Sequence, residues 1–168
     1  MVYMDCVEFK KEKAGDLPPP QHVIQDYDFI DLGGWTLPPP VGGTKFGNTA
    51  GMRIIPNVAG SGTLQNHLFI GQGKVEIIPT KDKLKEISEK LQKEVSSFQV
   101  STVGKHYFGP PGQPIITAYD CDRKEIHSAK GSQVQGISEN LLLMGEEICY
   151  IIIHGCEVAI EKICFFYV

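Results

Sequence analysis

The stretch EICYIIIHGCEVAIEKICFFYV, from Glu147 to Val168, decides the fold class. It contains two apolar runs, Ile148–Ile153 and Ile163–Val168, and both are far shorter than the roughly 18 apolar residues that a membrane-spanning helix needs. Short runs rich in β-branched and aromatic residues are typical of buried strands. We therefore predict two closing strands that meet at a turn near His154 and Gly155.

The second closing strand changes parity once. Val158 and Ile160 share one face at even positions, whereas Ile163, Phe165 and Tyr167 continue at odd positions. Because successive side chains of a strand point to opposite faces, this slip of one residue at Glu161 and Lys162 predicts a β-bulge.

Strand patterns also dominate the chain upstream of this stretch. PIITAYDCDRKEI (Pro114–Ile126) reads as a strand, a polar turn and a second strand, with Asp120 and Asp122 available to bond nearby backbone amides. Between residues 33 and 73, dense glycines separate short apolar runs, which indicates short strands joined by tight turns. We predict a mostly β protein that forms a single domain over residues 1–168.

One segment, TKDKLKEISEKLQKEVSSF, has helical periodicity instead. Its apolar residues recur at spacings of three and four, and Thr80 or Asp82 can cap its start. We predict one inserted amphipathic helix over about residues 81–96. The apolar stripe consists of Leu84, Ile87, Leu91 and Val95.

Composition and the first residues limit the partners and the compartment. The 168 residues carry a net charge of −4, whereas binding to nucleic-acid phosphates requires a basic surface. The start MVYMDCVEF lacks a basic region and has Asp5 where a signal peptide is apolar. We expect no nucleic-acid partner and no membrane span. The protein is secreted or at the cell surface if a leader was removed, and cytoplasmic otherwise.

The cysteine pattern argues against a zinc or dithiol motif. The number is odd and no C-x-x-C spacing occurs. Most of the cysteines lie in or beside apolar segments, so we expect buried reduced thiols. One disulfide between distant strands is the alternative, and it would indicate an oxidising compartment. The five are Cys6, Cys121, Cys149, Cys156 and Cys164.

Three segments carry a family resemblance. CVEF (Cys6–Phe9), ITAYDCDRKEI (Ile116–Ile126) and ICYIIIHGCEVAIEKICFF (Ile148–Phe166) occur in this order. They resemble the opening C-V-D-F-E, the middle hairpin ending in A-Y-D-x-D-G, and the closing A-I-D-N-I-x-F of a jelly-roll family. That family comprises domains of bacterial surface and secreted proteins, related to galactose-binding-like carbohydrate modules. The resemblance implies a jelly-roll β-sandwich that binds a carbohydrate or a surface without catalysis.

The resemblance also bears on calcium. In such modules the acid after the first Phe and the Asp of the last strand hold a structural Ca²⁺, which prefers oxygen ligands. Lys10 and Glu161 stand at these positions. A lysine in place of a ligand argues against the calcium site, so we expect no cofactor and no metal. The first and last strands are neighbours in this fold, and we expect an ion pair between Lys10 and Glu161 instead, with two unrelated surface charges as the alternative.

The histidines and glycine-rich turns show no catalytic motif. No H-x-H or H-x-x-x-H pair occurs, and no glycine segment matches a phosphate-binding loop. His154-Gly155-Cys156 falls at a predicted turn, where adjacency in sequence does not supply the geometry that a nucleophile and its base require. We therefore predict that the protein is not an enzyme. The histidines are His22, His67, His106, His127 and His154.

The candidate ligand-binding residues are mainly aromatic, because sugar-binding faces use exposed rings together with polar side chains. Trp35 lies among glycines and prolines, Tyr107 follows His106 before a turn, and Tyr27 lies between two aspartates. Packing of these rings under the proline-rich turns is the alternative. The full predicted set is Trp35, Tyr27, Tyr107, His106, Asp120 and Asp122.

We therefore expect a carbohydrate- or surface-binding module with a glycan or a cell-surface polymer as its partner. The first alternative is a structural protein that assembles into a homo-oligomer through the apolar ICFFYV (Ile163–Val168) and the proline-rich loops. The second alternative is a small hydrolase, for which no pair of residues with assignable roles is found.

Overall fold

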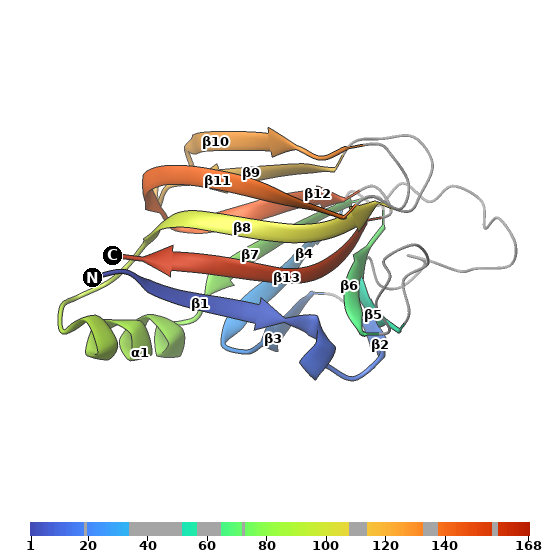
Figure 1. Ribbon diagram of the computed structural model, residues 1–168, viewed down its shortest axis with the longest axis horizontal. Helices are drawn as coiled ribbons and strands as arrows, with labels where there is room; N and C mark the ends of the chain where they lie inside the picture. Colours follow the sequence, from blue (N-terminus) through green and yellow to red (C-terminus); the bar gives the residue numbers. More distant parts are fainter. Residues whose placement is uncertain are drawn as a thin grey trace, which may run out of the picture.

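Two antiparallel sheets pack face to face in the computed structural model (Figure 1). The structure describes residues 1–18, 20–33, 52–56, 65–71, 73–107 without the Tyr107 side chain, 114–132, 138–155 and 158–168. Within these residues sheet A has seven strands and sheet B has six. The predicted β-sandwich with one helix is confirmed.

Sheet A forms the layer nearest the viewer in Figure 1. Its strand order is β11-β8-β13-β6-β5-β2, and β1 also pairs with β13. The strands are β1 (Tyr3–Glu8), β2 (Gly15–Leu17), β5 (Met52–Ile55), β6 (His67–Ile70), β8 (Phe98–Tyr107), β11 (Ser138–Ile148) and β13 (Val158–Tyr167).

Sheet B lies behind it with the order β10-β9-β12-β7-β4-β3. A short 3-10 helix, η1 (Phe9–Lys11), follows β1. The strands of sheet B are β3 (Gln21–Ile24), β4 (Tyr27–Gly33), β7 (Gly73–Pro79), β9 (Ile115–Tyr119), β10 (Glu125–Lys130) and β12 (Tyr150–Gly155).

The core lies between the sheets because alternate apolar residues of each strand point inward. Ile151 and Ile153 of β12 meet Val158, Ile160 and Ile163 of β13 in one buried cluster. None of the helices among the described residues has the length and apolar character needed to cross a lipid bilayer.

The helix α1 (Lys81–Leu91) closes one end of the sandwich, beside the chain termini (Figure 1). It begins as predicted, because the Thr80 hydroxyl accepts a hydrogen bond of 3.1 Å from the Lys83 amide. It ends at Leu91 and not near residue 96, since Gln92 adopts a left-handed conformation with φ 54°. Val95 is nevertheless buried, and its amide donates to the Ser88 hydroxyl.

The two closing strands do not form a hairpin. β12 pairs with β7 and β9 in sheet B, whereas β13 pairs with β8, β6 and β1 in sheet A. The hairpin predicted at His154 and Gly155 is therefore wrong, because β12 and β13 belong to different sheets. The predicted bulge is confirmed by a register shift between Ile160 and Lys162.

Four of the five cysteines form two disulfides, so the expectation of reduced thiols is wrong for them, while Cys156 lies outside the described residues. Cys6 and Cys164 are direct cross-strand partners in β1 and β13, with Cα atoms 4.0 Å apart. Cys121, in the turn after β9, bonds Cys149 between β11 and β12. Sequence spacing missed both bonds because their partners are 158 and 28 residues apart.

A buried hydroxyl network joins the sheets near α1. Tyr27 is fully buried, stacks on Phe165 with ring centroids 4.3 Å apart, and donates to the Asp5 carboxylate at 2.9 Å. Because its only hydroxyl proton goes to Asp5, Tyr167 donates in the 2.8 Å bond between the two tyrosines. Lys83 of α1 also contacts Asp5 at 3.1 Å, so this carboxylate fixes the helix to β1.

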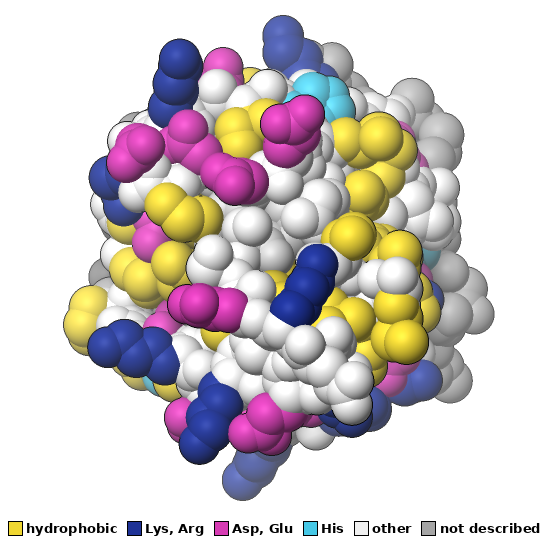
Figure 2. Space-filling model, turned by 90° about the vertical axis from the view of Figure 1, so that its left-hand side faces the viewer, with side chains coloured by type: hydrophobic (Ala, Val, Ile, Leu, Met, Phe, Trp, Pro, Cys, Tyr) yellow, Lys and Arg dark blue, Asp and Glu magenta, His cyan; other side chains and the backbone are white. Residues whose placement is uncertain are grey.

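The outer face of sheet A carries an apolar row at the same end of the sandwich. Four cross-strand partners of β11, β8, β13 and β1 form it, and it is most exposed at its two ends. Figure 2, in which this face lies toward the right, shows hydrophobic side chains gathered there. The row consists of Met144, Val100, Phe166 and Met4.

We predict that the Cys6–Cys164 bond contributes more stability than the Cys121–Cys149 bond. The chain-entropy relation predicts a larger stabilisation for a bond that closes a longer loop. The Cys6→Ala/Cys164→Ala variant should therefore be less stable than the Cys121→Ala/Cys149→Ala variant by about 1.5 kcal/mol. Urea unfolding of both variants, with disulfide content checked by mass spectrometry, measures the difference. An equal or opposite order would show that unfolded-chain entropy does not govern these bonds.

We also predict alkaline unfolding driven by the buried tyrosines. Burial is the main cause that raises the pKa of Tyr27 and of Tyr167 above the ordinary value near 10. Their contribution to stability is therefore complete below about pH 10 and is lost as pH rises further, because only the unfolded state ionises there. The part of the tyrosinate absorbance at 295 nm that comes from Tyr27 and Tyr167 should rise together with the loss of the β-sheet circular dichroism signal.

The Tyr27→Phe variant keeps the stacked ring but removes one buried hydroxyl. Its stability should fall less steeply above pH 10, by about 1.4 kcal/mol per pH unit for the missing group. Complete tyrosine ionisation with an unchanged circular dichroism spectrum would contradict the assignment.

Candidate metal centre

Three side chains that could bind a metal meet on the outer face of sheet A, at the end of the sandwich opposite α1. His67 begins β6, His106 lies near the end of β8, and Glu161 lies in the bulge of β13. These strands are neighbours in the order β8-β13-β6. The site therefore bridges three adjacent strands.

Strand register explains why these side chains share a face. Leu68 and Ile160 are cross-strand partners and both belong to the core. Side chains alternate along a strand, so His67 and Glu161, one position away from them, point outward. His106 is the cross-strand partner of Ala159 and points to the same side. Glu161 thus lies at the bulge of β13, the central strand of the three, on the same face as the two histidines.

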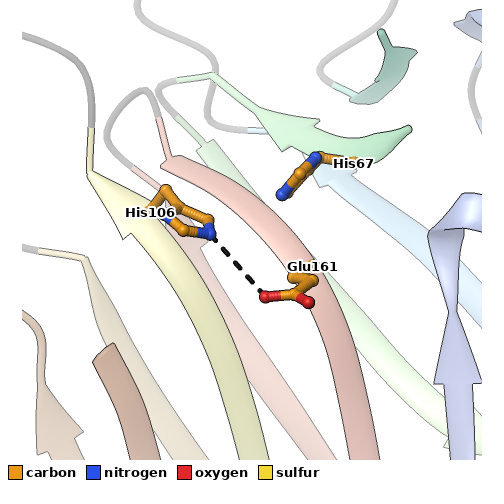
Figure 3. Close-up of side chains that lie close together, drawn as sticks. All are labelled: His67, His106 and Glu161. Atoms are coloured by element: carbon orange, nitrogen blue, oxygen red, sulfur yellow. Dashed lines mark ion pairs between the residues drawn. The ribbon is translucent and has the colours of Figure 1, made fainter. Parts of the chain in front are cut away.

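The polar atoms converge (Figure 3). One candidate ligand atom from each residue lies within 4.8 Å of the other two. His106 Nε2 lies 3.7 Å from Glu161 Oε2, and the centroids of the two imidazole rings are 5.3 Å apart with an interplanar angle of 73°. The three side chains thus surround a common point.

Both imidazoles are buried without enough hydrogen-bond partners. His67 is 0 % exposed and His106 is 3 % exposed. The Nδ1–H of His67 donates to the Gln65 carbonyl at 2.9 Å, which leaves its Nε2 as an unprotonated acceptor. In the described part of the chain, this Nε2 and both nitrogens of His106 are buried polar atoms with no hydrogen-bond partner. Such atoms are rare in folded proteins, where buried polar groups are satisfied by protein groups, ordered water or a bound ion.

The electrostatic surroundings favour a neutral imidazole at His67. Burial is the main cause that lowers the pKa of His67, and the neighbouring His106 lowers it further. A neutral imidazole is the form that binds a metal ion. The fixed tautomer matches known metal sites, in which a ligating histidine donates its other ring N–H to a carbonyl or a carboxylate.

A small polar pocket adjoins the centre and shares Glu161 with it. Gln65 donates to Glu161 Oε1 at 3.0 Å, while the other oxygen of this carboxylate faces His106. Glu161 is therefore held at the boundary between the buried histidines and the pocket. The pocket is lined by Glu8, Lys10, Gln65, Glu161 and Lys162.

The structure does not bring the predicted ligand-binding residues together. Trp35 lies outside the described residues, and for Tyr107 only the backbone, in β8, is described. Tyr27 is a buried core residue, so its prediction as a ligand platform is wrong. His106 is buried as well and belongs to the metal centre instead of an exposed sugar-binding surface.

The two aspartates form the hairpin turn between β9 and β10. Asp120 Oδ1 accepts hydrogen bonds from the amides of Asp122 and Lys124, both at 2.9 Å, which confirms the turn chemistry predicted for Asp120. With its carboxylate oxygen engaged by its own turn, Asp120 has a structural role here.

The predicted ion pair between Lys10 and Glu161 does not form. The Lys10 ammonium lies 4.0 Å from the Glu8 carboxylate, whereas Glu161 faces His106 and Gln65. The neighbouring β1 and β13 place Lys10 and Glu161 at the same pocket, but η1 turns the chain after Glu8. The expectation that the first and last strands are neighbours is confirmed, because β1 pairs with β13.

Sequence reasoning missed the centre because its residues come from three strands that are distant in the sequence. Local spacing rules detect only ligands that share one helix, loop or hairpin. The one usable signal was the parity slip at Glu161, since bulges are frequent beside functional sites.

A scan against protein-family models found no match, and no curated protein is similar enough to be counted as a relative.

We predict that the metal-free protein tolerates loss of the His106 imidazole. His106→Leu should leave its free energy of unfolding unchanged or raise it by about 1 kcal/mol, because unpartnered buried polar atoms are replaced by an apolar side chain of similar size. Urea unfolding in the presence of a chelator measures this. A loss of 3 kcal/mol or more, typical of disrupted core packing, would assign the imidazole a structural role and weaken its assignment as a ligand.

Proposed function

We propose that this protein is a β-sandwich module that binds a divalent transition-metal ion between β6, β8 and β13. The ligands are Nε2 of His67, an imidazole nitrogen of His106 and the carboxylate of Glu161. The proposal rests on one observation: imidazole nitrogens that are buried without a hydrogen-bond partner and converge with a carboxylate. It replaces the sequence-based prediction that the protein has no metal site.

The ligand types favour zinc over calcium or magnesium. Imidazole nitrogen suits zinc and related transition metals, whereas calcium and magnesium require oxygen ligands. Tetrahedral zinc with bonds of 2.0–2.1 Å needs ligand atoms about 3.4 Å apart. The present separations of up to 4.8 Å therefore require only a small inward rotation of side chains. Three protein ligands leave a fourth coordination position for water or another donor.

Binding without catalysis remains part of the proposal, together with an extracellular setting. Two disulfides are expected to persist in an oxidising compartment, and they support the secreted or cell-surface alternative.

Carbohydrate or surface binding stays a proposal that derives from the family resemblance. The apolar row on sheet A supports self-assembly as the second proposal, and a solution mass above that of one 18.6 kDa chain would favour it.

We predict that Zn²⁺ stabilises the protein and that Ca²⁺ does not. At a free zinc concentration 100 times the Kd, stabilisation should reach about 2.7 kcal/mol, and chelation should abolish it. Calorimetric titration and thermal melts measure both effects. All variants are prepared in a Cys156→Ser background, so that the one cysteine outside the two disulfides cannot compete for zinc.

Paired histidine variants locate the ion. His67→Ala and His106→Ala should each weaken zinc binding at least tenfold, whereas His154→Gln, which changes an exposed histidine of β12, should bind like the parent protein. Co²⁺ in place of zinc should show visible absorption bands that disappear in the alanine variants. Equal zinc affinity in His106→Ala and His154→Gln would refute the proposed centre.

A further inference from the structure

The pocket beside the metal centre has a charge arrangement that depends on the metal. Its lining contains two carboxylates and two ammonium groups, which balance when no ion is bound. Glu161 would be committed to the ion as a ligand. A divalent ion would therefore make the pocket and centre together strongly positive.

The two lysines of the pocket are available to an incoming anion. Glu8 has a closer partner in Lys11, at 3.3 Å, than in Lys10, at 4.0 Å. Among the described residues, Lys162 forms no ion pair, and its side chain is exposed. Once Glu161 binds the ion, Glu8 is the remaining carboxylate of the pocket lining, and because it is shared with Lys11 it does not balance the combined charge of Lys10 and Lys162.

The pocket fits a small charged group better than an apolar one. Every lining side chain is charged or carries an amide, and the volume is about 80 Å³. Lys162 is the cross-strand partner of Gly104, where a Cβ would come within 3.8 Å of the lysine side chain and 3.1 Å of Asn140 Oδ1. The missing side chain at Gly104 leaves room beside Lys162.

We infer that this pocket receives a carboxylate group of a ligand, which occupies the open coordination position of the metal and is neutralised by Lys10 and Lys162. This inference rests on the proposed metal centre. The carboxylate belongs to a free small acid or to an acidic sugar residue of a polymer, and these two sources share the same chemistry. Coupling is reciprocal, so the carboxylate should also tighten metal binding by the same factor.

The test uses the full chain loaded with Co²⁺, because its visible spectrum responds to a change of the fourth ligand. Acetate, galacturonate, oligogalacturonate and the neutral sugar galactose are the probes. We expect the acids to shift the spectrum and galactose to leave it unchanged. If acetate binds as tightly as galacturonate, the natural ligand is assigned as a free small acid. If galacturonate or its oligomer binds more tightly than acetate, the ligand is assigned as an acidic sugar of a polymer.

Lysine variants show whether the pocket takes part. Lys10→Gln and Lys162→Gln should each weaken carboxylate binding about fivefold or more at low salt, and should leave Co²⁺ loading intact. Lys124→Gln, at the exposed β9–β10 turn, is the matched control and should have no effect. Calorimetry with the metal-free protein should show no carboxylate binding.

The outcomes separate this inference from the proposed metal centre. If no metal binds, the metal centre itself fails. If Co²⁺ binds but no acid changes its spectrum, or if both lysine variants match Lys124→Gln, the centre stands and the carboxylate pocket is overturned.

Discussion

The structure depends on the pairing of β13, the last strand of the chain. One edge of β13 pairs along its length with β8. The other edge pairs first with β6, over Val158–Ile160, and then with β1, over Lys162–Tyr167. Glu161 lies where the pairing changes from one neighbour to the other. At this point the strand has an extra residue, and the register with β8 shifts.

This change of neighbour accounts for both ends of sheet A. Toward the C-terminus, β13 holds β1 through backbone pairing and the Cys6–Cys164 bond, and it buries Phe165 and Tyr167 against Tyr27 of sheet B. Toward its N-terminus, β13 lies between the strands that carry the two buried histidines. The covalent and aromatic contacts at one end can thus maintain the sandwich while the other end carries unsatisfied polar groups.

Buried imidazoles without partners lower the stability of a fold, because they lose hydrogen bonds to water and gain none in return. The two histidines lie on the outer face of the sheet, outside the core cluster, so this loss of stability does not involve the packing of the core. A bound ion would use the same nitrogens as ligands, so a feature unfavourable to the metal-free protein favours the metal-bound one. The charge of the adjoining pocket, which Lys10 and Lys162 line, would also depend on the bound ion.

The sequence by itself determined the local structure. Short apolar runs and strand–turn patterns identified several of the strands, spacings of three and four identified α1, and the change of parity in β13 located the bulge to within one residue. Asp120 could also be assigned to its turn. These features depend on neighbours in sequence, where backbone geometry limits the choices. The end of α1 was less certain because a left-handed residue at Gln92 leaves no periodic signal.

Only the tertiary structure decided which distant residues meet. The two disulfides, the burial of Tyr27 and the convergence of His67, His106 and Glu161 all follow from strand order and register. The hairpin predicted from β12 and β13 failed for the same reason, since an apolar run does not specify the sheet that it joins. Pairing partners are selected by the packing of the whole core, and a single sequence does not show that selection.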